Sequence, residues 1–473
     1  MYDTLIIGAG MSGLAAGIRL AHFDQRVCIL ERHTTIGGLN SFYRLGGRNY
    51  DVGLHALTNF TPKGTRQGPL ARMLRQLRFG WDEFSFAPQI GSRIAFPGVA
   101  MDFSNDFALL ESEVGRCFPA QKDNFQRLVG RIVGYDELDL SSAGQSARQL
   151  VSETISDPLL VEMLFCPLQF YGSAREHDMD FGQFCIMFRS IFSEGLARPL
   201  AGVRIILKKL VRKFKDLGGE LRLRAGVNRI ATEQGQAVGV VLDDGSQLTS
   251  RNILSSAGWL ETMRLCEDVS QEDERRAGQL SFTESISILD RQPKDLGHDR
   301  TVVFYNDSPQ FHWEKPDELV DVRSGVICSP NNFVYEEPLA EGVMRVTSLA
   351  NYERWNGLSE DEYRLEKLRA YDASVASAVR FVPDFRAAVV DTDMFTPTTI
   401  RRFTGHENGA VYGCPEKHYD GRTHLKNVFI CGTDQGFVGI IGSIISGISI
   451  ANQHLLRASS GVGDHDQAAV SNG

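Results

Sequence analysis

The chain has 473 residues, of which 42% are hydrophobic and 23% charged, a profile typical of globular proteins rather than disordered or multi-span membrane ones. Its formal net charge of −9 does not attract phosphate backbones, which argues against a nucleic-acid partner. The eight cysteines include no CxxC pair and no Cys/His cluster at zinc spacing, so we expect reduced thiols and no metal site. The apolar strand that directly follows "MYDT" lacks the pattern of a signal peptide, which predicts a cytoplasmic location.

The first 32 residues predict a strand, a glycine turn, a helix and a second strand, which is the βαβ unit of a doubly wound sheet. Gly8, Gly10 and Gly13 form GxGxxG at the turn. Gly8 permits the tight turn, Gly10 lets the backbone approach a pyrophosphate, and Gly13 lets the helix pack closely on the strand. The free N–H groups of the helix N-terminus would face the phosphates.

Glu31 ends the second strand, 18 residues after Gly13. A carboxylate there can accept hydrogen bonds from both hydroxyls of an adenosine ribose. It would repel a 2′-phosphate, so the pattern favours FAD or NAD over NADP.

The stretch "ERHTTIGGLNSFYRLGGRNYDVGLH" places Gly37 and Gly38 six and seven residues after Glu31. With GxGxxG and the acidic residue, this pair resembles the N-terminal signature of the FAD-dependent amine oxidoreductase superfamily. Later segments resemble the superfamily in the same order: "AGVNRI", "SSAG", "TPTTIRRFTGHENGAVYG" and "FICGTDQGFVGIIGSIISG". Within it, the chain is most similar to the branch of phytoene desaturases, carotenoid isomerases and retinol saturases.

The resemblance implies FAD as the cofactor and an α/β fold. A Rossmann-like FAD-binding domain would be assembled from residues 1–75, 201–262 and 396–458. Two insertions, 76–200 and 263–395, would form an α+β substrate-binding domain, and 459–473 a disordered tail. The candidate cofactor-binding residues are Gly8, Gly10, Met11, Ser12, Gly13, Glu31, Arg32, Gly37, Gly38, Leu39, Asn40, Val227, Ala257, Gly432, Asp434, Gly439, Ile440, Ile441 and Ser443.

The uncharged stretch "GFVGIIGSIISGISIA", residues 436–451, is shorter than the roughly 20 residues that cross a bilayer. Each glycine in a helix interior costs about 1 kcal/mol relative to alanine, so apolarity alone does not explain this stretch. We predict that Gly432 lets the chain turn, and that Gly439 and Gly442 let a helix begin against the flavin ring.

For a polyene substrate, specificity would come from an apolar tunnel. Aromatic segments at 165–172, 181–192 and 333–339 are candidates for its walls, against the alternative of ordinary core packing. His55, in "DVGLHALTN", is a candidate to move a proton or to steady a cationic substrate, and a structural role is the alternative. Asp434 is a second catalytic candidate, although it could instead hydrogen-bond the ribityl chain of the flavin.

These features predict an FAD-dependent desaturase, saturase or isomerase acting on an isoprenoid or carotenoid-like polyene. A flavin amine oxidase or protoporphyrinogen oxidase is the alternative, although the stretch before the last helix lacks the Trp and the Tyr-Glu-Gly-Ala run usual in amine oxidases. A prenyl-lipid escort protein without flavin is disfavoured by the intact glycine motifs. The basic segment 204–215 is a candidate for peripheral contact with a membrane, against the alternative of a solvated helix face.

Overall fold

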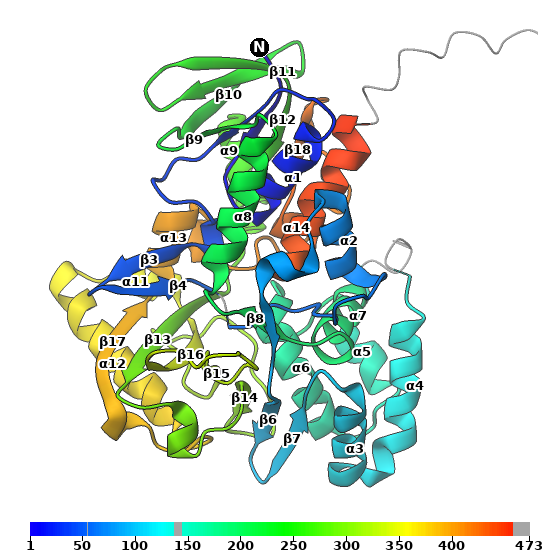
Figure 1. Cartoon of the computed structure of the whole chain (residues 1–473), viewed down its shortest axis with the longest axis vertical. Coiled ribbons are helices and arrows are strands. Elements are labelled where there is room, and N and C mark those ends of the chain that lie inside the picture. Colours follow the sequence, from blue (N-terminus) through cyan, green and yellow to red (C-terminus); the bar gives the residue numbers. More distant parts are fainter. Residues whose placement is uncertain (54, 137–143, 457–473) are drawn as a thin grey trace, which may run out of the picture.

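The computed structural model describes residues 1–53, 55–136 and 144–456, and the tail predicted at 459–473 lies outside them. The chain forms two lobes, each built around a seven-stranded sheet (Figure 1). The lobe that contains the N-terminus lies at the top of the view and the second lobe below it.

The sheet of the first lobe has the order β10-β11-β12-β1-β2-β9, and β18 pairs with β12. Four pairs of neighbouring strands run parallel: β9 with β2, β2 with β1, β1 with β12, and β12 with β18. In contrast, β10, β11 and the start of β12 form an antiparallel meander. The strands are β1 (Tyr2–Ile7), β2 (Val27–Leu30), β9 (Glu220–Arg222), β10 (Val227–Glu233), β11 (Gln236–Leu242), β12 (Gln247–Ser255) and β18 (Val428–Ile430). The parallel core confirms the predicted Rossmann-like α/β fold.

The helices of this lobe are α1 (Met11–Ala21), α2 (Gly68–Leu77), α8 (Val203–Asp216), α9 (Trp259–Leu265), α13 (Pro397–Thr404) and α14 (Gly439–Ile450). A Cβ added at Gly447 of α14 would stand 2.0 Å from the carbonyl oxygen of Ser12 in α1. The two helices therefore touch through their backbones, and a side chain at Gly447 would separate them.

The uncharged stretch forms α14 and continues as a π-helical turn over Ala451–Leu456. Within the described residues, Gly439–Leu456 is the one helix long and apolar enough to cross a membrane, and 61% of it is buried. Its burial against α1 accounts for its apolarity.

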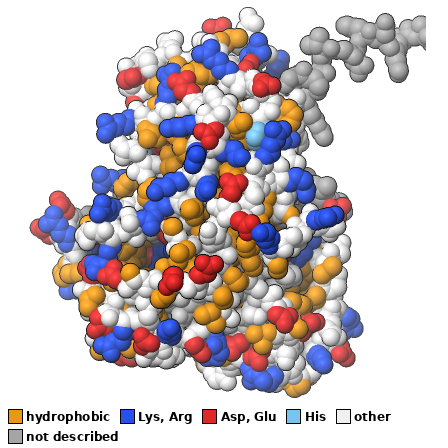
Figure 2. Space-filling view, in the orientation of Figure 1, with side chains coloured by type: hydrophobic (Ala, Val, Ile, Leu, Met, Phe, Trp, Pro, Cys, Tyr) orange, Lys and Arg blue, Asp and Glu red, His pale blue; other side chains and the backbone are white. Residues whose placement is uncertain are grey.

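The basic segment 204–215 forms most of α8, which buries Val203, Ile206, Leu207, Leu210 and Phe214. Lys and Arg side chains lie on the face shown in Figure 2, where α8 crosses the front of the molecule. The helix is amphipathic, with an exposed basic face that includes Lys208, Arg212 and Lys215.

The sheet of the second lobe has the order β17-β13-β16-β15-β14-β6-β7 and is antiparallel except where β14 meets β6. Its strands are β6 (Ser92–Phe96), β7 (Val99–Phe103), β13 (Ser281–Leu289), β14 (Val302–Asn306), β15 (Ser324–Cys328), β16 (Gly342–Ala350) and β17 (Val389–Phe395). The hairpin strands β3 (Phe42–Leu45) and β4 (Arg48–Asp51), and the pair β5 (Phe86–Pro88) and β8 (Ala197–Pro199), lie outside both large sheets.

The helices of this lobe are α3 (Phe107–Cys117), α4 (Lys122–Val133), α5 (Ala147–Ser152), α6 (Pro158–Gly172), α7 (Phe181–Phe188), α11 (Tyr352–Asn356) and α12 (Glu360–Ala378). The short helix α10 (Gln271–Arg275) contacts α9, since Trp259 Nε1 donates to Asp273 Oδ1 at 3.1 Å. Val375 of α12 packs against one face of the sheet, in a core that includes Tyr305 and Val346. Phe304 points into a separate aromatic core with Phe165 of α6.

We keep the division into two domains as a proposal. Its support is that the strands of the first sheet all lie within 1–75, 201–262 and 396–458, whereas those of the second all lie within 76–200 and 263–395.

Candidate functional site

Three glycines lie in the turn between β1 and α1, and they differ in what surrounds them. A Cβ at Gly8, whose φ is +96°, would stand 2.5 Å from Ser256 Oγ, and one at Gly13 would stand 2.2 Å from the Gly8 carbonyl oxygen. Packing within the chain therefore requires both. Gly10 has an ordinary φ of −75°, and nothing lies within 4 Å of the position of its Cβ. Neither strain nor packing explains Gly10, which faces open space.

Glu31 directly follows β2 and is 7% exposed. Its Oε2 accepts the N–H of Ala9 at 3.0 Å, and its Oε1 accepts the N–H of His33 at 3.0 Å. The carboxylate thus ties the end of β2 to the glycine turn, and each oxygen keeps a further lone pair for a ligand.

The Gly37–Gly38 pair approaches the first glycine turn, since Gly37 forms a bridge with Gly10 and donates its N–H to the Ala9 carbonyl at 3.0 Å. A Cβ at Gly37 would overlap Leu207 and the backbone of Ser41, whereas nothing lies within 4 Å of a Cβ at Gly38. Gly38, like Gly10, borders open space.

This open space is a groove of about 310 Å³. The predicted residues that line it are Gly8, Gly10, Met11, Ser12, Glu31, Arg32, Gly37, Gly38, Leu39, Asn40, Val227, Ala257, Gly432 and Ser443. Residues more than 400 positions apart in the chain therefore meet in one groove.

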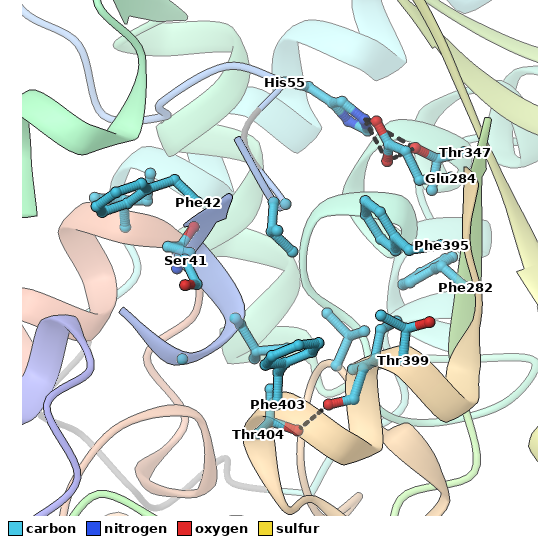
Figure 3. Close-up of a pocket in the computed structure, with 18 of the residues that line it drawn as sticks. Ser41, Phe42, His55, Phe282, Glu284, Thr347, Phe395, Thr399, Phe403 and Thr404 are labelled. Atoms are coloured by element: carbon cyan, nitrogen blue, oxygen red, sulfur yellow. Dashed lines mark hydrogen bonds and ion pairs between the residues drawn. The ribbon is translucent and has the colours of Figure 1, made fainter. Parts of the chain in front are cut away.

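A second, larger cavity of about 440 Å³ adjoins the groove. The two share nine lining residues: Glu31, His33, Gly38, Leu39, Asn40, Phe403, Thr404, Thr433 and Ser443. The predicted residues Gly439, Ile440 and His55 line this cavity. Its walls are mainly apolar and include Phe42, Tyr43, Phe170, Tyr171, Phe282, Phe395, Phe403 and Tyr412. Figure 3 shows several of these rings facing one another across the space.

The walls come from different elements than those predicted. Of the three aromatic segments expected to form a tunnel, only 165–172 contributes, through Phe170 and Tyr171. Segments 181–192 and 333–339 line neither of these two cavities, and their buried phenylalanines pack in the aromatic core, which is the alternative of ordinary core packing. A helix such as α7, which buries aromatic residues on several sides, gives no sequence signal of which face meets a cavity.

One end of the larger cavity carries a polar cluster (Figure 3). His55 Nε2 lies 3.1 Å from each carboxylate oxygen of Glu284 and 2.8 Å from Thr347 Oγ1. The Thr347 hydroxyl donates to Glu284 Oε2 at 2.6 Å, and Arg345 Nε donates to Glu284 Oε1. Histidine, carboxylate and hydroxyl thus share one hydrogen-bonded unit.

Glu284 is 2% exposed, and its burial opposes ionisation. The neighbouring Arg345 guanidinium and His55 outweigh that penalty and hold the pKa of Glu284 well below its usual range. Arg345 is also buried, yet Glu284 raises the pKa of its guanidinium. The cluster therefore contains a charged pair within an apolar wall.

Four predicted residues, Gly13, Asp434, Ile441 and Gly442, lie outside the linings of both cavities. Gly13 packs against Gly8, and Ile441 is buried in the core that contains α1 and α14. Asp434 is 1% exposed and accepts the N–H groups of Trp259 and Cys414, both at 2.6 Å. Burial opposes its ionisation, but Lys417 and these N–H groups lower the pKa of the carboxyl. Its carboxylate holds two loops together.

Comparison with known proteins identifies the family. A family model described as "Flavin containing amine oxidoreductase" matches residues 11–453. The chain belongs to this family. It is 23% identical to the chloroplastic prolycopene isomerase of Daucus carota over 96% of this chain and 80% of the relative, and 22% identical to the all-trans-retinol 13,14-reductase of Danio rerio over 96% and 86%. An oxidoreductase structure from Methanosarcina mazei shares the fold, with a TM-score of 0.68 at 16% identity over 95% of this chain and 99% of that one.

As a member of the flavin containing amine oxidoreductase family, the chain is an oxidoreductase with FAD as its cofactor. The groove fits this group, because Gly10 and Gly38 leave room beside the N-terminus of α1, where free N–H groups favour phosphate. Glu31 borders the same groove with lone pairs to accept ribose hydroxyls.

Sequence reasoning missed Glu284 and Thr347. Both lie on strands, β13 and β16, and their side chains meet His55 across more than 200 residues of chain. A glutamate in the middle of "SFTESISIL", a strand buried along its whole length, was the available signal, since a fully buried carboxylate needs a partner.

Proposed function

We propose that this FAD-dependent oxidoreductase acts on an apolar, isoprenoid or carotenoid-like polyene as a desaturase, saturase or isomerase. The observation that carries the proposal is the continuity of a glycine-lined groove with a larger chamber whose walls are mainly aromatic and aliphatic. Such walls favour a hydrocarbon chain over a charged ligand, because a buried charge needs a partner. The relatives named as a prolycopene isomerase and an all-trans-retinol 13,14-reductase support this substrate class.

We propose that the lining residues of the groove hold FAD, with its phosphates at the N-terminus of α1 and its ribose at Glu31. When bound, FAD supplies hydride transfer at its N5 atom. The aromatic walls would orient the polyene and exclude water. His55, in the wall of the larger cavity, would hold or move a proton of the substrate. Asp434 would support the loops around the site rather than contact the substrate.

We further propose a cytoplasmic location, with the basic face of α8 as the candidate for peripheral contact with an anionic membrane. Sedimentation with anionic liposomes tests this contact, which should weaken with salt. Absence of salt-sensitive binding would count against it.

Expression of the chain in cells that accumulate squalene, phytoene or lycopene tests the substrate class. We expect at least one of these lipids to be desaturated, saturated or isomerised, as shown by chromatography of the extracted lipids. A matched strain that expresses Gly10→Ala controls for changes that do not depend on the cofactor site. If all the lipids are unchanged while an amine drives peroxide formation by the purified protein, the amine oxidase alternative replaces the proposal.

A further inference from the structure

The polar cluster of His55, Glu284 and Thr347 lies in a cavity wall that is otherwise mainly apolar. We propose that Glu284 is a positioning residue: with Thr347, it holds His55 in the tautomer that carries its proton on Nε2, so that Nδ1 exchanges a proton with a ligand in the cavity. This inference rests on the proposed function, in which His55 handles a substrate proton.

The hydrogen bonds determine which nitrogen carries the proton. An ionised carboxylate can only accept hydrogen bonds, so the nitrogen that lies 3.1 Å from both Glu284 oxygens must donate. The Thr347 hydroxyl gives its own proton to Glu284 Oε2, which leaves its oxygen free to accept from His55 Nε2 at 2.8 Å. All three contacts of Nε2 therefore require an N–H on this atom.

Glu284 must be ionised to act only as an acceptor, and the surrounding charges ensure this. Arg345 Nε donates to Glu284 Oε1, and Arg345 Nη2 donates to the Asp51 carbonyl at 3.1 Å. The Asp51 carboxylate in turn pairs with Arg198 at 2.7 Å. These partners come from β16, β4 and β8, so the guanidinium that keeps Glu284 charged is itself fixed by separate elements.

The other nitrogen of His55 is available to a ligand. Within the described part of the chain, Nδ1 has no hydrogen-bond partner, and the side chain is 12% exposed in the wall of the cavity. The other polar contacts of His55 reach its carbonyl oxygen, from Arg198 Nη1 at 3.5 Å and Cys328 Sγ at 3.7 Å.

Charge balance suits proton transfer at this atom. When Nδ1 takes a proton from a bound ligand, the ring becomes an imidazolium whose positive charge lies against the Glu284 carboxylate. The titratable and charged groups around it are Glu284 on β13, Arg345 on β16, Arg198 on β8, Cys328 on β15, Asp51 on β4 and Tyr171 on α6. The two arginines already pair with Glu284 and Asp51, so the new charge adds to a nearly neutral cluster.

Nitrogen NMR of the holoenzyme tests the tautomer without any substrate. Histidine is labelled with ¹⁵N, the signal of His55 is assigned by its loss in His55→Gln, and long-range couplings to the ring protons distinguish the two nitrogens. We expect His55 to show the Nε2–H tautomer at neutral pH. Thr347→Val, which leaves the carboxylate in place, should keep this tautomer. Glu284→Gln should give a mixture, because a carboxamide both donates and accepts.

A wild-type spectrum with the proton on Nδ1 would overturn the proposal, and this result requires no folded variant. So would a pure Nε2–H spectrum in Glu284→Gln. With a polyene that the cell assay shows to be converted, Glu284→Gln should keep its FAD and lose about 100-fold or more in turnover. If no polyene is converted but the tautomers behave as expected, the substrate class fails and the positioning role stands. If a polyene is converted but the tautomers do not behave as expected, the positioning role alone fails.

Discussion

Replacing Gly10 with alanine tests whether the open space beside this glycine belongs to FAD. The backbone at Gly10 has φ −75° and ψ −179°, which alanine adopts without strain, and nothing lies within 4 Å of the new methyl group. In the absence of FAD, the substitution should therefore fit the fold.

Two small contributions determine how Gly10→Ala changes the free energy of unfolding. Gly10 is the N-cap of α1, where alanine is less favourable than glycine by about 1 kcal/mol. Alanine also restricts the unfolded chain, which stabilises the fold by about 0.4–1 kcal/mol. The two nearly cancel, so the free energy of unfolding of the apoprotein should stay within about 1 kcal/mol of wild type.

The affinity for FAD should fall strongly in Gly10→Ala. The methyl group would hold the pyrophosphate away from the N–H groups at the start of α1, and loss of one charge-assisted hydrogen bond costs about 1.5–3 kcal/mol. This corresponds to an FAD affinity that is about 10- to 150-fold weaker. Isothermal titration calorimetry of the deflavinated protein with FAD measures the affinity. Urea denaturation of the same apoprotein preparation measures the free energy of unfolding.

Gly13→Ala is the matched control. Its methyl group would stand 2.2 Å from the Gly8 carbonyl oxygen, so this variant should be destabilised by about 1–3 kcal/mol even without FAD. If apo Gly10→Ala binds FAD as tightly as wild type, the space beside Gly10 is not part of the cofactor site and the reasoning fails.

Three further predictions concern stability. Burial lowers the pKa of His298 from 6.5 to about 4, so between these pH values the unfolded chain binds a proton that the folded chain does not. Melting curves should therefore show the free energy of unfolding falling by up to about 3 kcal/mol as the pH drops from 6.5 to 4. The variant His298→Asn should remove this part of the fall. Gly447→Val should force α1 and α14 apart and lower the free energy of unfolding by at least about 2 kcal/mol in urea, and wild-type stability would contradict the close contact with Ser12. Asp434→Asn should lower the free energy of unfolding by about 2–4 kcal/mol, because the carboxylate accepts two buried N–H groups. It should leave the pH profile of polyene conversion unchanged. Normal stability with lost conversion would instead make Asp434 catalytic.

The sequence was sufficient to predict which residues of the first lobe meet in one groove. Gly8, Gly10 and Glu31 follow a local pattern in which spacing along the chain determines spacing in space, because a strand, a turn and a helix leave little freedom. The roles of individual glycines were harder to predict. Gly442 was expected to touch the flavin, yet it lines neither cavity, and the close approach in α14 occurs at Gly447 instead.

The substrate side could not be predicted to the same depth. The pairing of His55 with Glu284 depends on how a loop of the first lobe meets the sheet of the second, and no local pattern encodes that contact. Phe403 lies on α13, whose sequence matched a family motif, but nothing in its spacing indicated that its ring borders both cavities. Long-range packing determines these positions.

Anaerobic incubation of the purified holoenzyme with a polyene is the most direct test of the central claim. Phytoene and poly-cis lycopene are supplied in liposomes to the oxidised and to the chemically reduced protein. The flavin is followed by its absorbance at about 450 nm, and the lipids are separated by chromatography. We predict that at least one polyene is desaturated, saturated or isomerised with one of the two flavin states. Unchanged polyenes in both states, together with bleaching of the flavin by a primary amine, would contradict the account.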